Sequence, residues 1–417
     1  MSTMKVTLRK ILAPLLSLAL LMLSNGFFLT FVSARLHSQS YSPISIGVIQ
    51  GSYYAGFLIA ALKSEHIIQR IKHIRAFSFF ASIATVCTLA TVFATHIPIW
   101  IVMRFVMGVC IAGLYVVIES WFLIVSDKKN RGVVLGIYML GLYLSQSASQ
   151  YIINFVDIDT MMAFIVAGML GAFSILPVTF TRSTIPEMEV PPPSAILKFF
   201  SIAPLGTAGA VLAGVMLGSF YTFGPNFAQS YNFSIAHIMS LTIAGGFLLQ
   251  YPIGHLSDYV DRRKMVIVVS AMTLLMAAGL IIFLQSKFWV LFFSFMLGGF
   301  SFTIYPLCIT QVVDRVHASH ATTVAGAMLF AYSIGAVIGP LITPIFIAIF
   351  RGEKGLYYSM AFSALLLFVL GLVMISIKRP VPKNEQESFV AIPPQTPVVG
   401  DLDPRNEIPK QDPSRKQ

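Results

Sequence analysis

The chain has 417 residues, of which 56% are hydrophobic and only 11% are charged. Soluble domains carry a charge on about a quarter of their residues, so this composition excludes an ordinary soluble protein and favours a lipid bilayer as the solvent. The net charge of +11 does not indicate a nucleic-acid partner, because the basic residues lie in short loops between apolar stretches.

The apolar stretches predict an all-α polytopic membrane protein. A membrane-spanning helix needs about 20 mostly apolar residues. Twelve such helices are predicted in chain order at residues 10–34, 43–62, 75–95, 98–125, 132–155, 160–180, 204–228, 234–254, 265–285, 288–312, 322–349 and 356–377. Cys87, Cys110 and Cys308 lie inside these stretches without a CxxC or Cys/His pattern, so we expect neither a disulfide framework nor a metal site.

The distribution of Lys and Arg predicts the orientation of the chain. If the N-terminus is cytoplasmic, 16 Lys and Arg residues lie in the inside segments, and only Arg35, Lys287, Arg351 and Lys354 lie in the outside segments. Because cytoplasmic loops are enriched in basic residues, both termini are predicted to be cytoplasmic. The absence of a disulfide pattern fits a bacterial inner membrane.

An internal repeat divides the chain. Shifting the sequence by 190 residues places Ala13-Pro14-Leu15 on Ala203-Pro204-Leu205, Gly56-Phe57-Leu58 on Gly246-Phe247-Leu248, and Gly108 on Gly298. We therefore predict two parallel six-helix repeats, residues 1–180 and 204–378, the arrangement of one main transporter architecture. Residues 181–203 form the predicted cytoplasmic linker, and the polar, proline-rich residues 379–417 a disordered cytoplasmic tail.

Two motifs resemble the major facilitator superfamily. The segment after the eighth span has Gly254, then Asp258, then the basic pair Arg262-Arg263, and the fourth span contains Arg104-Phe-Val-Met-Gly108. Both are similar to signatures of that superfamily, although Asp261 stands where a glycine is usual and Ile68 replaces the aspartate in the first repeat. Glu119-Ser120-Trp121 and His73-Ile74-Arg75 are similar to the YcaD-like bacterial subgroup.

Arg104 and Glu119 are the charged residues well inside the predicted spans. Charges at membrane depth normally face a bundle interior or a water-filled cavity. Their separation of 15 residues corresponds to roughly 22 Å along a helix, so they cannot pair with each other. We predict that both take part in proton or substrate coupling, a role that the resemblance implies for Arg104. For Glu119, a fixed structural acceptor remains the alternative.

The resemblance also implies a cavity lined by the first, fourth, seventh and tenth helices. The predicted cavity residues on these helices are Asn25, Tyr115, Tyr221, Asn226, Tyr305 and Gln311, and the fifth helix adds Gln146. Gly254, Asp258, Arg262 and Arg263 are predicted to form a cytoplasmic gate, in which Asp258 meets the positive end of the fifth helix and stabilises the outward-facing state. For each cavity residue, a helix–helix hydrogen bond is the alternative.

These features predict a secondary active transporter of a small amphipathic or anionic organic solute, working by alternating access and coupled to protons. No GxxxxGK[ST] motif is present, so ATP is not the expected energy source. We expect a monomer in the lipid bilayer with no cofactor, no metal and no enzymatic activity. A drug or metabolite efflux antiporter, a membrane-embedded lipid-handling protein and a transporter-like sensor are the alternatives.

Overall fold

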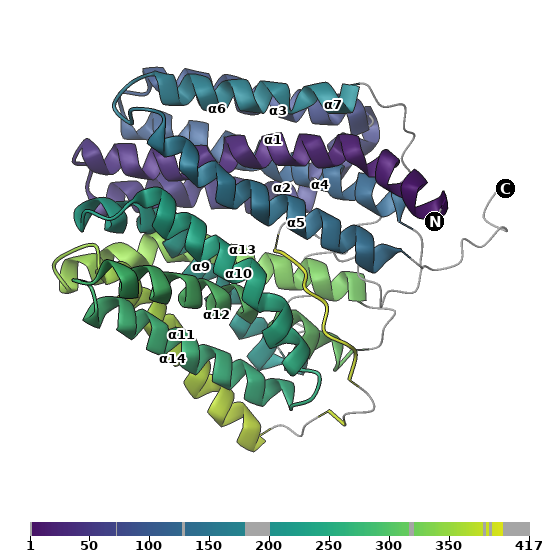
Figure 1. The fold of residues 1–417 in the computed structure, drawn as a ribbon, viewed down its shortest axis with the longest axis vertical. Coiled ribbons are helices and arrows are strands. Elements are labelled where there is room, and N and C mark those ends of the chain that lie inside the picture. The colour runs from purple at the N-terminus through teal and green to yellow at the C-terminus, as the bar shows by residue number, and fades with distance from the viewer. Residues whose placement is uncertain are drawn as a thin grey trace.

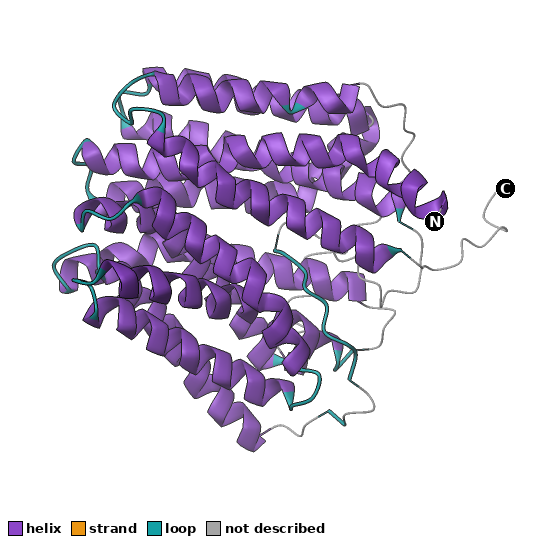
Figure 2. Ribbon diagram, in the orientation of Figure 1, coloured by secondary structure: helices purple, strands orange, loops and turns teal. Residues whose placement is uncertain are grey.

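The computed structural model describes residues 2–71, 73–126, 130–179, 201–316, 321–377, 381–382 and 386–394. These residues are helical or in loops, and no strand occurs in them (Figure 2). The first group of helices is α1 (Ser2–Ser38), α2 (Pro43–Ile71), α3 (His73–Ala90), α4 (Ile97–Val125), α5 (Arg131–Ser149), α6 (Met162–Phe173) and α7 (Ile175–Thr179), with short 3₁₀ helices η1 (Thr91–Phe93) and η2 (Gln150–Asn154). The second group is α9 (Pro204–Ser230), α10 (Ile235–Leu256), α11 (Arg262–Ile282), α12 (Lys287–Val313), α13 (Ala321–Ile349) and α14 (Gly355–Ile377).

Eleven helical segments of the described chain are long and apolar enough to cross a membrane, with α6 and α7 together forming one of them. The remaining predicted span is α10, a helix of 22 residues that packs against α12 and α5. It falls outside the set of eleven, and its sequence includes the polar residues His237, Gln250 and His255.

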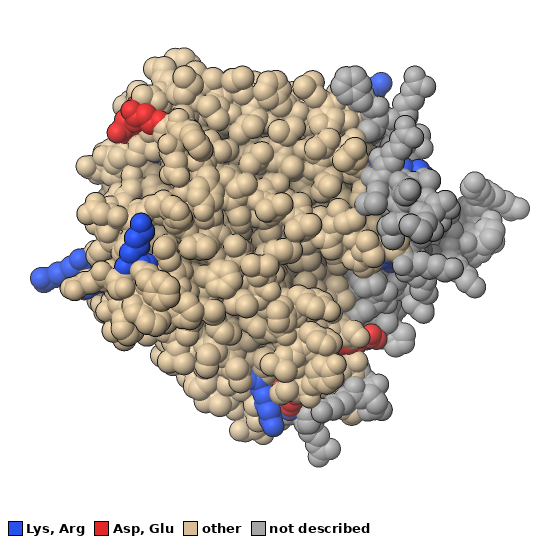
Figure 3. Space-filling view, in the orientation of Figure 1, with Lys and Arg blue, Asp and Glu red and all other residues tan. Residues whose placement is uncertain are grey.

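The outer surface of the bundle suits a lipid environment. On the face drawn in Figure 3, charged side chains lie near the ends of the helices, and a broad uncharged belt lies between them. Large apolar side chains within the helices, such as Val86, Leu144 and Leu248, are exposed. An apolar surface of this extent on a bundle of long helices indicates contact with acyl chains.

The helices form two halves that follow each other along the chain, α1–α7 and α9–α14 (Figure 1). The 190-residue repeat reappears in their packing. Gly108 of α4 lies against the carbonyl oxygen of Tyr53 in α2, and Gly298 of α12 lies against that of Thr242 in α10. A Cβ at either position would overlap that oxygen, so the two helix pairs approach closely in the same way.

The two ends of the bundle differ. We call the end of the bundle where α1 begins the terminal face, and the other end the opposite face (Figure 1). At the opposite face, polar contacts join the two halves: Ser33 Oγ donates a hydrogen bond to the carbonyl of Thr222, and His37 Nε2 lies 3.0 Å from Ser230 Oγ. Gly47 of α2 packs against the backbone of Pro340 in α13. The two halves are therefore in close contact at the opposite face.

Candidate functional site

A cavity of about 780 Å³, open solvent at its mouth included, lies between the two halves. Its wall contains six tyrosines, from α2, α4, α5, α9 and α13. The lining residues are Asn25, Leu29, Tyr53, Tyr54, Phe57, Tyr115, Tyr143, Gln146, Leu217, Tyr221, Phe302, Tyr332, Ser333, Ala336 and Pro394.

The polar groups of the wall are oriented by hydrogen bonds. Asn25 Nδ2 donates to Tyr53 Oη at 3.1 Å, which joins α1 to α2. Gln146 Nε2 donates to Tyr221 Oη at 3.0 Å, which joins α5 of the first half to α9 of the second. The second bond crosses between the halves, so any relative movement of the halves at this depth would change it.

Arg104 lies directly behind this wall and is fully buried. Its Nη2 donates a hydrogen bond of 2.6 Å to Gln50 Oε1, and its guanidinium carbon is 4.6 Å from the ring centroid of Tyr53. Nε and Nη1 have no hydrogen-bond partner among the described residues. A positive charge therefore lies against the back of a tyrosine whose other side faces the cavity.

Glu119 is also fully buried, but it lies outside the cavity lining. Tyr138 Oη of α5 donates a hydrogen bond of 2.5 Å to its carboxylate. As expected from the helix geometry, Arg104 and Glu119 have separate partners. The contact with Tyr138 suits both a protonatable group and a structural acceptor.

Four of the predicted cavity residues line the cavity in this structure: Asn25, Tyr115, Gln146 and Tyr221. Asn226, Tyr305 and Gln311 are buried in the C-terminal half and are not among the lining residues. The ring of Tyr305 packs edge-on against that of Tyr332, 5.2 Å away, so Tyr305 lies behind the wall rather than in it.

The sequence analysis missed Tyr53, Tyr54, Tyr143 and Tyr332, which come from α2, α5 and α13. The expected cavity was assigned mainly to other helices, so these residues were not considered. One signal was available: the 190-residue offset places Gln146 on Ala336 and Tyr143 on Ser333, and all four residues line the cavity.

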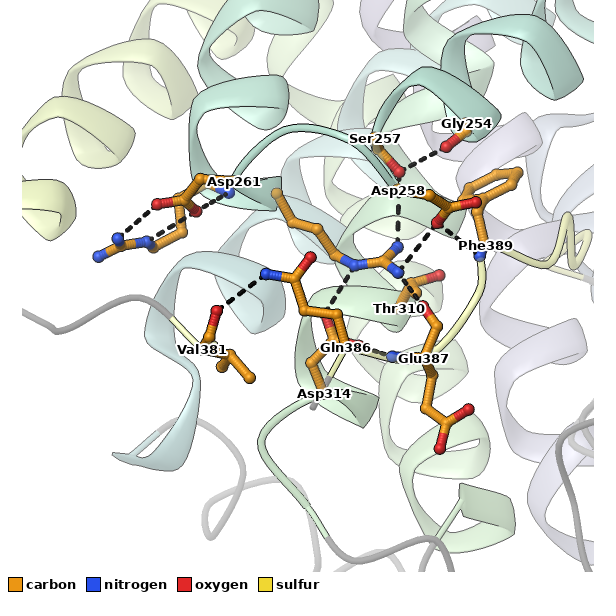
Figure 4. A network of polar contacts seen from close by, with 12 residues as sticks. Gly254, Ser257, Asp258, Asp261, Thr310, Asp314, Val381, Gln386, Glu387 and Phe389 are labelled. Carbon is orange, nitrogen blue, oxygen red and sulfur yellow. Dashed lines mark hydrogen bonds and ion pairs between the residues drawn. The ribbon is translucent and has the colours of Figure 1, made fainter. Parts of the chain in front are cut away.

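A polar cluster at the terminal face contains the predicted gate residues (Figure 4). Arg262 is buried between two carboxylates: its Nε is 2.6 Å from Asp314, and its Nη2 is 3.1 Å from Asp258. Arg263 instead pairs with Asp261, the N-cap residue of α11, at 2.6 Å. Burial raises the pKa of Asp261, but the hydrogen bonds from Arg263 outweigh it and hold that pKa below its ordinary value.

A segment near the C-terminus completes this cluster. The carboxylate of Asp258 accepts a hydrogen bond of 2.8 Å from the backbone N–H of Phe389, and the Phe389 ring covers Gly254. Among the described residues, the partners of Asp258 belong to the C-terminal half and to this segment. The latch between Asp258 and the start of α5 remains a prediction for another state.

Two halves of long apolar helices around a central cavity define the chain as a polytopic membrane protein with the architecture of a transporter. The family model described as Major Facilitator Superfamily matches residues 15–340 and 234–400. The chain belongs to this superfamily. Membership points to a transporter rather than an enzyme.

Individual relatives agree with this assignment. The chain is 27% identical over 385 residues to a protein of Escherichia coli O17:K52:H18 (strain UMN026 / ExPEC) named "Uncharacterized MFS-type transporter YcaD", with 90% of this chain and 98% of that protein covered. Among solved structures, the nucleoside transporter NupG superposes with a TM-score of 0.74 at 13% identity, covering 88% of this chain and 99% of that one. A bacterial homologue of the human lysosomal transporter Spinster, in an inward-facing and occupied conformation, has a TM-score of 0.72 at 15% identity, covering 91% and 98%. The superfamily and the YcaD-like resemblance are thus confirmed.

Proposed function

We propose that this protein is a secondary active transporter that moves a small amphipathic or anionic organic solute by alternating access, driven by a proton gradient. The observation that carries the proposal is the tyrosine-lined cavity between two repeated halves. A site shared by two halves can be exposed to either side of the membrane when the halves rock against each other.

The composition of the wall supports the solute class. Tyrosine rings offer apolar faces with hydroxyl groups at their edges, which suits a ligand that is partly apolar and partly polar. Arg104 lies behind Tyr53 of this wall, and its burial weakens screening by water. Its positive potential favours a neutral or anionic solute over a cationic one.

The distribution of Lys and Arg supports a cytoplasmic terminal face. The opposite face is then external, and its contacts between the halves correspond to an inward-facing state. A green fluorescent protein fused after Gln417 is expected to fluoresce, and alkaline phosphatase inserted after Gln285 is expected to be active. The reverse result for both fusions would overturn this orientation.

Solute flux in proteoliposomes tests the proposed activity. A panel of organic acids and amphipathic metabolites is first screened by thermal shift, and ligands that stabilise the purified protein are then assayed with an imposed pH gradient. We expect flux that depends on the gradient, and its direction distinguishes uptake from antiport export. Flux that is unchanged when the gradient is collapsed would contradict proton coupling.

A matched pair of variants on α13 ties this flux to the cavity. Ser333→Phe fills the cavity, whereas Leu341→Phe places the same ring on an exposed position of the same helix. We expect loss of flux only for Ser333→Phe. Equal flux in both variants would show that the solute passes elsewhere.

A further inference from the structure

A segment near the C-terminus, residues 386–394, crosses the terminal face and reaches the cavity. Figure 1 shows it as a yellow loop trace that runs along the terminal face to the region between α5 and α13. The sequence analysis assigns these residues to a disordered tail, whereas here they have defined contacts with the bundle. The tail as a whole is polar and proline-rich. Residues 386–394 nevertheless include three large apolar residues, Phe389, Val390 and Ile392.

The backbone of the segment is held by the cluster at Arg262. The backbone N–H of Glu387 donates a hydrogen bond of 3.0 Å to Asp314, and the Glu387 carbonyl accepts one from the Arg262 guanidinium (Figure 4). Two residues further on, the N–H of Phe389 donates to Asp258. Ion pairs of the buried Arg262 with these two carboxylates keep the acceptors in place. The segment is therefore recognised through its main chain by three side chains of the C-terminal half.

Apolar contacts then lead the segment inwards. The Phe389 ring occupies the space that a side chain at position 254 would need. Ile392 is only 2% exposed and joins the hydrophobic core, and Pro394 is one of the residues that line the tyrosine cavity. The path from the terminal face to the cavity is thus occupied by this chain's own residues.

We propose that residues 386–394 are a plug that closes the terminal-face mouth of the cavity and must leave before a solute can pass on that side. The inference rests on the proposed transport function. While the Phe389 N–H binds Asp258, that carboxylate is not available for the predicted latch at the start of α5. The plug and the latch therefore compete for Asp258. The plug thus occupies the mouth of the cavity and keeps Asp258 from the latch.

Thiol labelling tests the plug without knowledge of the solute. The reporter is Ser333→Cys, a small change in the cavity wall, in purified full-length protein labelled with N-ethylmaleimide. The native Cys87, Cys110 and Cys308 are buried, and protein without the reporter gives the background rate. We compare the full chain with a deletion of residues 386–417 and with Phe389→Ala.

If the plug occupies its site about nine-tenths of the time, its full release in the deletion should speed labelling by about ten-fold, and Phe389→Ala should speed it by a smaller factor. Glu387→Gln is the matched control, because this exposed residue contributes its backbone to the anchoring contacts and should label as slowly as the parent. Equal rates in the parent, the deletion and Phe389→Ala would overturn the plug. Labelling of Lys287→Cys, at the opposite face, should be the same in all proteins, and an increase there as well would also contradict it by indicating general loosening.

A disulfide lock provides a second measurement that does not depend on removing the tail. Gly254→Cys and Phe389→Cys place two thiols where the ring now contacts the helix. Oxidation should abolish flux and reduction should restore it, and each single variant should respond to neither treatment. Undiminished flux in the oxidised double variant would show that the plug need not leave. Labelling tests the plug and does not depend on flux. If labelling behaves as expected and no flux is found, the transport proposal fails and the plug remains.

Discussion

Arg104 and Glu119 lie on the same helix, but each is held by a different neighbour. Arg104 binds Gln50 of α2, and Glu119 binds Tyr138 of α5. The sequence alone predicts that both charges are inside the membrane and that they do not pair, because composition and helix geometry decide these points. It does not predict their partners, since these depend on how α4 packs against α2 and α5.

Replacing Gln50 is expected to destabilise the protein by removing the hydrogen-bond acceptor of a buried charge. Gln50→Met should reduce the free energy of unfolding by about 1.5–3 kcal/mol, the usual contribution of a hydrogen bond to a charged group. The matched control is Gln250→Met in α10, because the buried amide of Gln250 has no hydrogen-bond partner among the described residues. Reversible unfolding in mixed micelles measures both, and equal losses would argue against a special role of the Arg104 contact.

Glu119→Gln distinguishes a proton carrier from a structural acceptor. Glutamine retains a carbonyl oxygen that can accept the hydrogen bond from Tyr138 but cannot take up a proton at physiological pH. If Glu119 carries the proton, the variant should fold normally and lose flux driven by a pH gradient, while Tyr138→Phe should retain it. Unchanged gradient-driven flux in Glu119→Gln would leave only the structural role.

At the scale of helices, the predicted spans agree closely with the structure because apolar length and loop charges are encoded locally. The cavity wall is less accessible to such reasoning. Tyr53 and Tyr54 on α2 face the cavity because α2 crosses between α4 and α13, and that crossing is a tertiary property. Asn226 and Gln311 are polar residues on expected cavity helices, but their positions on those helices turn them into the bundle.

The loop between α13 and α14 gives the opposite face a predicted pH dependence. Glu353 is buried there, with His37 Nδ1 3.9 Å from its carboxylate, and burial raises the pKa of Glu353 to about 7 from an ordinary value of 4.5. Burial disfavours the charged form, so protonation favours the closed opposite face. The contribution of Glu353 protonation to the stability of the closed state is fully present below pH about 4.5 and is lost as the pH rises through about 7.

Spin labels at Gln39→Cys and Gln285→Cys, both exposed at the opposite face, would report its opening. Raising the pH from 4.5 to above 7 should increase the population with a long distance, by at most on the order of a hundred-fold in the equilibrium constant. Glu353→Gln should remove this dependence. His37→Asn is measured alongside, because a protonated His37 would favour the charged carboxylate and oppose the effect. Persistence of the full pH dependence in Glu353→Gln would assign it to another group.

For the whole molecule, the contact of Gly47 with the backbone of Pro340 helps to set how closely the halves approach at the opposite face. Gly47→Val should force them apart there and lengthen the distance between the same two spin labels. Gly136→Ala on α5 is the control, because its new Cβ meets open space and should leave the distance unchanged. An unaltered distance in Gly47→Val would show that this contact does not limit closure.

The internal repeat of the molecule is visible in the sequence as the 190-residue offset, because both copies retain glycines where helices touch. The same offset continues through the plug, because it places Phe199 on Phe389, Ile202 on Ile392 and Pro204 on Pro394. Its anchoring to Arg262, Asp314 and Asp258 is made through its main chain, and main-chain recognition leaves only a weak trace in residue identities.

The plug is tied to α14 by the eight residues 378–385. A tethered segment competes for its site at a fixed local concentration, on the order of millimolar for a short tether, regardless of how much protein the membrane contains. A solute arriving at the terminal face must therefore displace a competitor that cannot be diluted. The level at which such a solute half-saturates flux would then reflect the strength of the plug as well as the affinity of the cavity.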